Sequence, residues 1–246
     1  MIEFIDEKGM IDPIGEPLGA KVAVTAFSAH TFAELVARTG AKRIKDVYGC
    51  VDVEMYMFET NGKKVLVYKS PVGAPAAVSA MEEVMACGVE HVVAFGICGA
   101  LTDVPAHTFV VPNRAFRDEG TSLHYAPASE FAEVKNSKVV EKRLAECGVN
   151  TVTGGTWTTD GFYRETKSRA ETMRKNGCVA VDMECSALQI AADFRGKQFY
   201  TFFITADSLA GEEWEPNDIL ELKVTDSTTV AATAAMTMAI RIAEKA

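Results

Sequence analysis

The stretch Val181-Asp182-Met183-Glu184-Cys185-Ser186-Ala187-Leu188 places two carboxylates among apolar residues. The residues before it, 177–181, predict a short buried strand, and the apolar residues from 187 to 192 predict a helix. The two acids are therefore expected at a junction between a strand and a helix. Acidic groups are favoured there because they accept hydrogen bonds from the free N–H groups of the first helical turn. Asp182 fits either that capping role or a functional one.

Glu184 is the stronger functional candidate of the two acids. A carboxylate has two acceptor oxygens, so it can accept hydrogen bonds from two hydroxyl groups at once. This is the chemistry needed to bind the vicinal diol of a ribose.

Composition limits the classes of partner. The chain has 246 residues, of which 48% are hydrophobic and only 8 are proline, which predicts one compact α/β domain spanning residues 1–246. Its formal charge of -9 gives no general attraction to nucleic acid or to an anionic membrane. We therefore expect a small-molecule partner, with no nucleic-acid and no membrane partner.

Targeting and metal-binding signals are weak in this sequence. Residues 1–7 contain no basic region, and no apolar run approaches membrane-spanning length, so a cytoplasmic protein is expected. The cysteines form no C-x-x-C pair, and no histidines are paired at metal spacing, which predicts no metal site and no cofactor. The histidines are His30, His91, His107 and His124.

Apolar runs and turn residues predict alternating strands and helices. Asn61-Gly62 is a strong hairpin signal between two of the strands. No internal repeat or low-complexity linker marks a domain boundary. The predicted strands are 21–26, 51–58, 63–69, 91–95, 109–112, 151–156, 177–181 and 199–205, and the predicted helices end near 39, 86, 147, 195 and 243.

Glycines follow the predicted strand 91–95. Gly96 and Gly99 predict a turn in which the backbone can approach a ligand, although a plain tight turn is the more common explanation of such a pair. The polar segment 117–125 is long for a simple connection and indicates a loop with a function.

Two further residues are candidates because of the strands that they follow. Asp207 lies at the carboxyl end of the strand 199–205, where α/β sheets collect ligand-binding groups, and its alternative role is to cap a turn. Phe162 follows the strand 151–156 and could stack on a flat base, although an aromatic residue in this position is more often part of the core.

Four motifs in a fixed order resemble the nucleoside phosphorylase family, which contains bacterial purine nucleoside phosphorylase and uridine phosphorylase. They are G-I-C-G-A at 96–100, R-D-E-G-T-S-L-H-Y at 117–125, V-D-M-E-C-S-A at 181–187 and T-A-D at 205–207. The likeness runs through nearly the whole chain, and the second and third motifs are specific. The resemblance implies a three-layer α/β/α domain around a mixed, partly barrel-like sheet. It also implies a homo-oligomer, a dimer or a hexamer, in which a neighbouring subunit completes each site.

The resemblance further implies a pentosyltransferase that cleaves the N-glycosidic bond of a ribonucleoside. Met183 and Glu184 would contact the ribose, with Glu184 binding the 2′ and 3′ hydroxyls. Asp207 would be the catalytic acid that protonates N7 of a leaving purine. General acid catalysis of this kind contributes roughly 10²–10⁴-fold to rate.

The implied base pocket favours a purine. Phe162 would stack near the base, and Val181 and Asp182 would line its pocket. Uridine phosphorylases carry a Gln and an Arg that bind the uracil edge, whereas the aligned positions here hold Thr166 and Ser168. A pyrimidine substrate is therefore disfavoured.

The phosphate site departs from the family pattern. Residues 27–31 replace the G-D-P-x-R loop, and Val51, Ala94 and Ile97 replace two arginines and a hydroxyl residue that hold phosphate. Phosphate remains a candidate co-substrate, but its site is degenerate. The remaining candidates for an anion or nucleophile region are His30, Gly96 and Gly99.

Three functional classes stay open. The first is a phosphorylase with an unusual phosphate site. The second is a hydrolytic nucleosidase that uses water, although the water-activating Glu of that subgroup aligns near Thr31, with only His30 and Glu34 close by. The third is a non-catalytic relative that binds a nucleoside or a base, since one fold can carry different functions.

Overall fold

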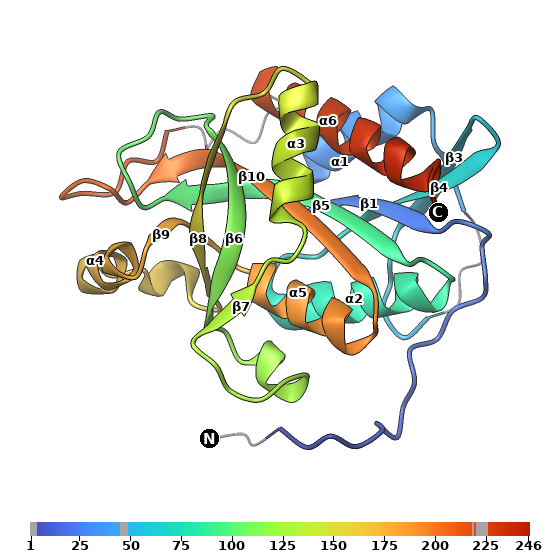
Figure 1. Ribbon diagram of the computed structural model, residues 1–246, viewed down its shortest axis with the longest axis horizontal. Helices are drawn as coiled ribbons and strands as arrows, with labels where there is room; N and C mark the ends of the chain where they lie inside the picture. Colours follow the sequence, from blue (N-terminus) through green and yellow to red (C-terminus); the bar gives the residue numbers. More distant parts are fainter. Residues whose placement is uncertain (1–3, 45–48, 218, 220–225) are drawn as a thin grey trace.

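A computed structural model describes residues 4–44, 49–217, 219 and 226–246, which form a mixed sheet packed between helices (Figure 1). The strands are β1 (Val22–Ala26), β2 (Lys42–Arg43), β3 (Met55–Thr60), β4 (Lys63–Lys69), β5 (His91–Ala100), β6 (Phe109–Asp118), β7 (Phe131–Glu133), β8 (Thr151–Thr159), β9 (Cys178–Asp182) and β10 (Gln198–Ser208). The helices are α1 (Ala29–Thr39), α2 (Ala74–Ala86), α3 (Ser137–Glu146), α4 (Lys167–Lys175), α5 (Cys185–Phe194) and α6 (Asp226–Ala243), with short 3₁₀ helices η1 (Thr121–His124) and η2 (Phe162–Arg164).

Helices cover both faces of the sheet. Side chains alternate along a strand, so Val22 and Val24 of β1 face a core shared with α1, α3 and α6, whereas Ala23 faces a core shared with α2 and α5. Figure 1 shows the same division, with α1, α3 and α6 on one side of the sheet and α2 and α5 on the other. This arrangement confirms the predicted three-layer α/β/α architecture.

Part of the sheet closes on itself. The strand order is β10-β6-β8-β9-β5-β1-β4-β3-β2, and β10 also pairs with β5. The additional pairing joins β5, β9, β8, β6 and β10 into a ring, because β5 pairs with β10 along its whole length and with β9 at its end. The predicted barrel-like character of the sheet is therefore confirmed.

Gly96 and Gly99 do not form a turn, which corrects the prediction from sequence. Both lie inside β5, where Gly99 pairs with Val181 on β9 and with Asp207 on β10. A Cβ atom at Gly99 would lie 2.8 Å from Cγ1 of Val181 and 2.9 Å from Cδ1 of Leu209. The glycine is needed because the side chains of neighbouring residues leave no room for another side chain.

The polar segment 117–125 is more ordered than a loop. Its first residues end β6, and the next residues form η1. The guanidinium of Arg117 donates hydrogen bonds to the hydroxyl groups of Ser122 and Ser129 and to the carbonyl oxygen of Pro127. Arg117 therefore holds this segment together.

The predicted hairpin at Asn61-Gly62, between β3 and β4, is confirmed.

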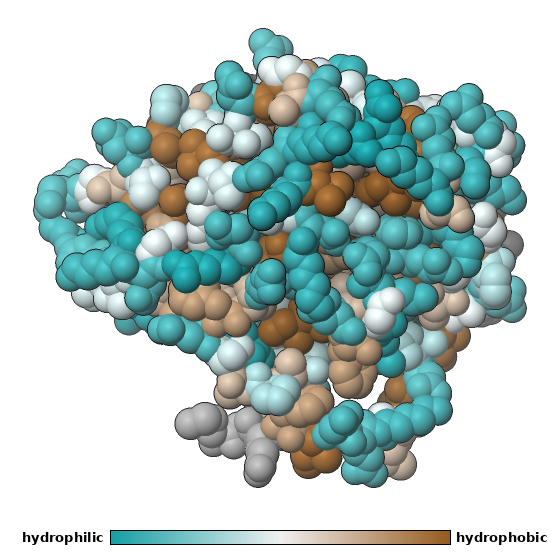
Figure 2. All heavy atoms as spheres, viewed as in Figure 1, coloured by the Kyte–Doolittle hydropathy of each residue, from teal (hydrophilic) through white to brown (hydrophobic). Residues whose placement is uncertain are grey.

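Hydrophilic residues cover most of the face of the molecule drawn in Figure 2, and hydrophobic residues appear there in small separate patches. Across the ranges that the structure describes, no helix combines the length and the apolar character needed to cross a membrane.

Candidate active site

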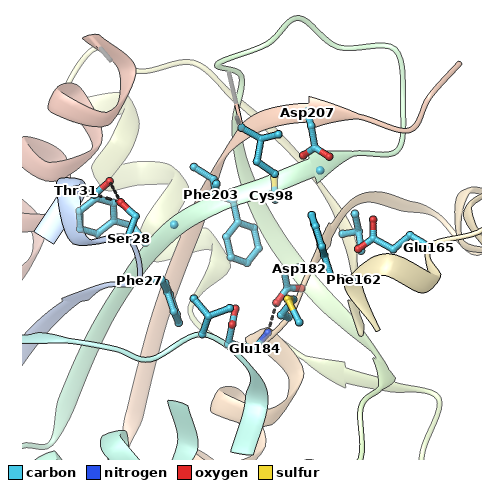
Figure 3. Close-up of a pocket in the computed structure, with 18 residues that line it drawn as sticks. Phe27, Ser28, Thr31, Cys98, Phe162, Glu165, Asp182, Glu184, Phe203 and Asp207 are labelled. Atoms are coloured by element: carbon cyan, nitrogen blue, oxygen red, sulfur yellow. Dashed lines mark hydrogen bonds between the residues drawn. The ribbon is translucent and has the colours of Figure 1, made fainter. Parts of the chain in front are cut away.

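A cavity of about 290 Å³ lies where β1, β5 and β10 end and where β9 leads into α5 (Figure 3). Its position follows from the parallel pairing of β1, β5 and β10, whose carboxyl ends meet at one edge of the sheet. The residues that line it are Phe27, Ser28, Thr31, Val72, Phe95, Gly96, Ile97, Cys98, Gly99, Phe162, Glu165, Val181, Asp182, Met183, Glu184, Phe203, Asp207 and Ile219.

Asp182 ends β9 and holds the start of α5. Its Oδ2 atom accepts hydrogen bonds from the backbone N–H groups of Glu184 (2.7 Å) and Cys185 (2.6 Å). Its Oδ1 atom accepts from the hydroxyl groups of Thr156 and Thr158 on β8, each at 2.9 Å. Burial raises the pKa of Asp182, and these four donors oppose that rise. The carboxylate lines the cavity, but its acceptors are already occupied, so its capping role is the one that the contacts support.

Glu184 is the N-cap residue of α5, and its side chain turns toward α2. Its Oε1 atom accepts a hydrogen bond of 2.6 Å from the backbone N–H of Gly73, the N-cap residue of α2. The residue is only 8% exposed, and burial followed by the charge of Asp182 raises the pKa of Glu184 to about 8. The backbone of Gly73 and that of Met183 both hydrogen-bond to this carboxyl group, and no described side chain does, so the carboxylate has acceptor capacity left for a ligand in the cavity.

Asp207 reaches the cavity from β10 at an irregularity in the sheet. The register between β10 and β5 shifts between Thr205 and Asp207, and a bulge of this kind redirects the side chains around it. Asp207 is 2% exposed, and its Oδ2 atom accepts a hydrogen bond of 2.7 Å from Nε1 of Trp214. Burial raises the pKa of Asp207, so protonation of this carboxyl extends closer to neutral pH than for an exposed aspartate.

The residues predicted to contact a base and a ribose line the same cavity. Val181, Asp182, Met183, Glu184 and Phe162 are all among its walls. The Phe162 residue is 36% exposed, so it is not simply part of the core. The structure thus brings these side chains together with Asp207, as the resemblance implied, while the role of each remains a prediction.

One acid in the cavity was not predicted from sequence. Glu165 directly follows η2, and burial together with the charges of Asp207 and Asp182 raises the pKa of Glu165 to about 7. No periodic pattern in this polar loop indicates which side chain turns inward. Its distance of three residues from Phe162 was the one available signal.

The loop after β1 and the start of α1 supply two hydroxyl groups to the lining of the cavity. Ser28 is the N-cap residue of α1, and its Oγ atom accepts a hydrogen bond of 3.1 Å from the N–H of Thr31. The Ser28 hydroxyl in turn donates to Oγ1 of Thr31 at 2.8 Å. Figure 3 shows these two residues on the side of the cavity away from Glu165 and Phe162.

No lysine, arginine or histidine is among the described residues that line the cavity, whereas four are carboxylic acids. His30 is exposed on α1 and does not reach the lining. Ile97 does line the cavity and is apolar, and Ala94 is buried in the core between the sheet and α2. The described side chains of the lining therefore supply no positive charge that could bind a phosphate.

Comparisons with known proteins identify the family of this chain. The model of the phosphorylase superfamily matches residues 21–244. A purine nucleoside phosphorylase, DeoD-type, from Bacillus subtilis (strain 168) is 28% identical over 220 residues, which are 84% of this chain and 87% of that protein. One from Bacillus thuringiensis (strain Al Hakam) is 27% identical over 205 residues, 81% of this chain and 82% of that protein. The chain belongs to the phosphorylase superfamily, as a member of its nucleoside phosphorylase family.

Proposed function

We propose that this protein cleaves the N-glycosidic bond of a purine ribonucleoside. One observation carries the proposal: a single apolar cavity holds Glu184 and Asp207, each with one carboxyl oxygen bound by the protein and the other without a side-chain partner among the described residues. The relatives named above are purine nucleoside phosphorylases, which supports the same substrate class.

The proposed orientation places the ribose at Glu184 and the base at Asp207. Figure 3 shows these two acids apart from one another across the cavity, with Phe162 on the side of Asp207. Glu184 would accept hydrogen bonds from the ribose hydroxyl groups. Asp207 would donate a proton to N7 of the purine as the glycosidic bond breaks, because neutralising the negative charge of the departing base lowers the barrier. The raised pKa of Asp207 favours the protonated form that this step requires.

The charge of the cavity is the basis for choosing between phosphate and water as the nucleophile. A phosphate dianion would enter a site whose described lining has four acids and no cation, and burying an unpaired charge is costly. This favours either a phosphorylase with weak phosphate binding or, as the second candidate, a hydrolase that uses water. Ser28 and Thr31 supply hydroxyl groups that could hold either nucleophile.

Assembly and location remain predictions. Val72, Ile97 and Phe162 line the cavity and are partly exposed, which supports a homo-oligomer, a dimer or a hexamer, that covers the mouth of the site. A cytoplasmic location and activity without a cofactor are expected on the sequence alone.

The Glu184→Gln variant tests the proposed ribose contact. The amide keeps the size of the side chain and can still accept from Gly73, but it loses the charge, and a hydrogen bond to a charged group contributes about 1.5–3 kcal/mol. Ribonucleoside affinity should fall at least about tenfold, measured by calorimetry.

Wild-type affinity should also rise between about pH 7 and about pH 9, because the diol binds the ionised form and the pKa of Glu184 is about 8.

A 2′,3′-dideoxynucleoside is the control for that experiment. It lacks both hydroxyl groups, so its affinity should be the same for the two proteins and should not follow the pKa of Glu184. If the variant bound ribonucleosides as tightly as wild type, the ribose contact would have to be assigned elsewhere.

The Asp207→Asn variant tests protonation of the base. Asparagine can still accept the hydrogen bond from Trp214 but cannot give a proton to N7. Cleavage of a purine nucleoside should slow by about 10²-fold or more, whereas cleavage of nitrophenyl riboside, whose leaving group needs no proton, should change little. The measurement is kcat/KM for both substrates. Equal losses would indicate that Asp207 has a structural role.

A phosphate titration tests the nucleophile. Each lost arginine contact with phosphate is charge-assisted and contributes about 1.5–3 kcal/mol, so three losses leave phosphate binding weak. Cleavage should therefore saturate well above millimolar phosphate, or proceed without it and yield free ribose, with the sugar product identified by chromatography. Stoichiometric ribose 1-phosphate at sub-millimolar phosphate would contradict this expectation. Nucleoside binding without turnover would instead favour a non-catalytic relative.

A further inference from the structure

Glu165 is the acid of the cavity that the proposed reaction does not use. It follows η2 directly, and its backbone N–H donates a hydrogen bond of 3.4 Å to the carbonyl oxygen of Phe162, so one short turn positions both side chains. Figure 3 shows Glu165 on the same side of the cavity as Phe162 and Asp207, away from Glu184. This is the side proposed to hold the base.

The carboxylate of Glu165 has no hydrogen-bond partner or ion-pair partner within the described part of the chain. Three of the basic side chains on the following helix, α4, are engaged elsewhere. Lys167 pairs with Glu212, Arg169 pairs with Asp118, and the guanidinium of Arg174 donates to the carbonyl oxygen of Leu209. Both oxygens of Glu165 are therefore available to a ligand.

Asp207 is the acid whose negative charge opposes ionisation of Glu165. The two carboxyl groups interact electrostatically, and ionising both at once in this apolar cavity is unfavourable. Asp182 also lies near Glu165, but its four hydrogen-bond donors already occupy it. In the free site the charge of Asp207 raises the pKa of Glu165, so a proton shared by the two acids lies on Glu165. N7 of a bound purine accepts a hydrogen bond only from a protonated Asp207, and this leaves Glu165 as the carboxylate that accepts one.

We propose that Glu165 accepts a hydrogen bond from the exocyclic amino group of a 6-aminopurine, so that the site selects adenine-type nucleosides over 6-oxopurine nucleosides. This inference rests on the proposed function. Adenine presents an acceptor at N7 beside a donor at its 6-amino group, which matches one protonated acid and one carboxylate. A 6-oxopurine presents two acceptors on that edge, so its oxygen would face a carboxylate or require a second proton. Mismatched polar groups in a buried site discriminate strongly between substrates.

The test compares adenosine and inosine in three proteins: wild type, Glu165→Gln and Glu171→Gln. Glu171 lies on α4 and does not line the cavity, so its variant makes the same charge change outside the site. Wild type and Glu171→Gln should prefer adenosine by at least about tenfold in kcat/KM. Glu165→Gln should lose most of that preference, because its amide NH₂ group can donate to the 6-oxygen of inosine. Thermal unfolding checks that the variants are folded.

The outcomes separate this inference from the proposed function. If wild type cleaves nucleosides but does not prefer adenosine, or if Glu165→Gln keeps the wild-type preference, the role of Glu165 is overturned and the proposed function stands. If nucleosides bind without being cleaved, the ratio of the two Kd values replaces the ratio of kcat/KM. If wild type neither binds nor cleaves either nucleoside, both proposals fail.

Discussion

The site depends on the buried carboxylate of Asp182. It joins two hydroxyl groups of β8 to the first N–H groups of α5, and so fixes the angle at which the chain leaves β9. Glu184 lies two residues further on, and this angle directs its side chain toward the N-terminus of α2. Because all four donors surround one buried acid, loss of its charge would leave several polar groups without partners. A structural acid thus positions the acid proposed to bind the ribose.

The second constraint is the balance of charge in the cavity. Four acids line it, no described lining residue is basic, and burial is the first cause of the raised pKa at Glu165, Asp182, Glu184 and Asp207. Such a site suits a neutral ligand that brings hydroxyl and amino donors, because these replace the hydrogen bonds that water would otherwise give. It is poorly suited to a free anion. The same balance therefore links three proposals: a neutral nucleoside as substrate, weak binding of phosphate, and recognition of the base edge by Glu165.

Local sequence patterns predicted much of the fold and part of the site. The junction that contains Asp182 and Glu184 could be predicted because strand and helix periodicities meet there, and its structure agrees with that prediction. Gly99 was expected in a turn because glycine usually marks one, whereas the close packing of β9 and β10 keeps it in a strand. Glu165 could not be predicted, since only tertiary contacts show that its side chain lies near Asp207.

The most direct test is a crystal structure of the protein with a purine C-nucleoside, whose carbon–carbon glycosidic bond cannot be cleaved. The 2′ and 3′ hydroxyl groups should lie within hydrogen-bond distance of the Glu184 carboxylate. The base should stack near Phe162, with its N7 position facing Asp207. A ligand bound outside this cavity, or bound within it with the ribose at Asp207 and the base at Glu184, would contradict the account.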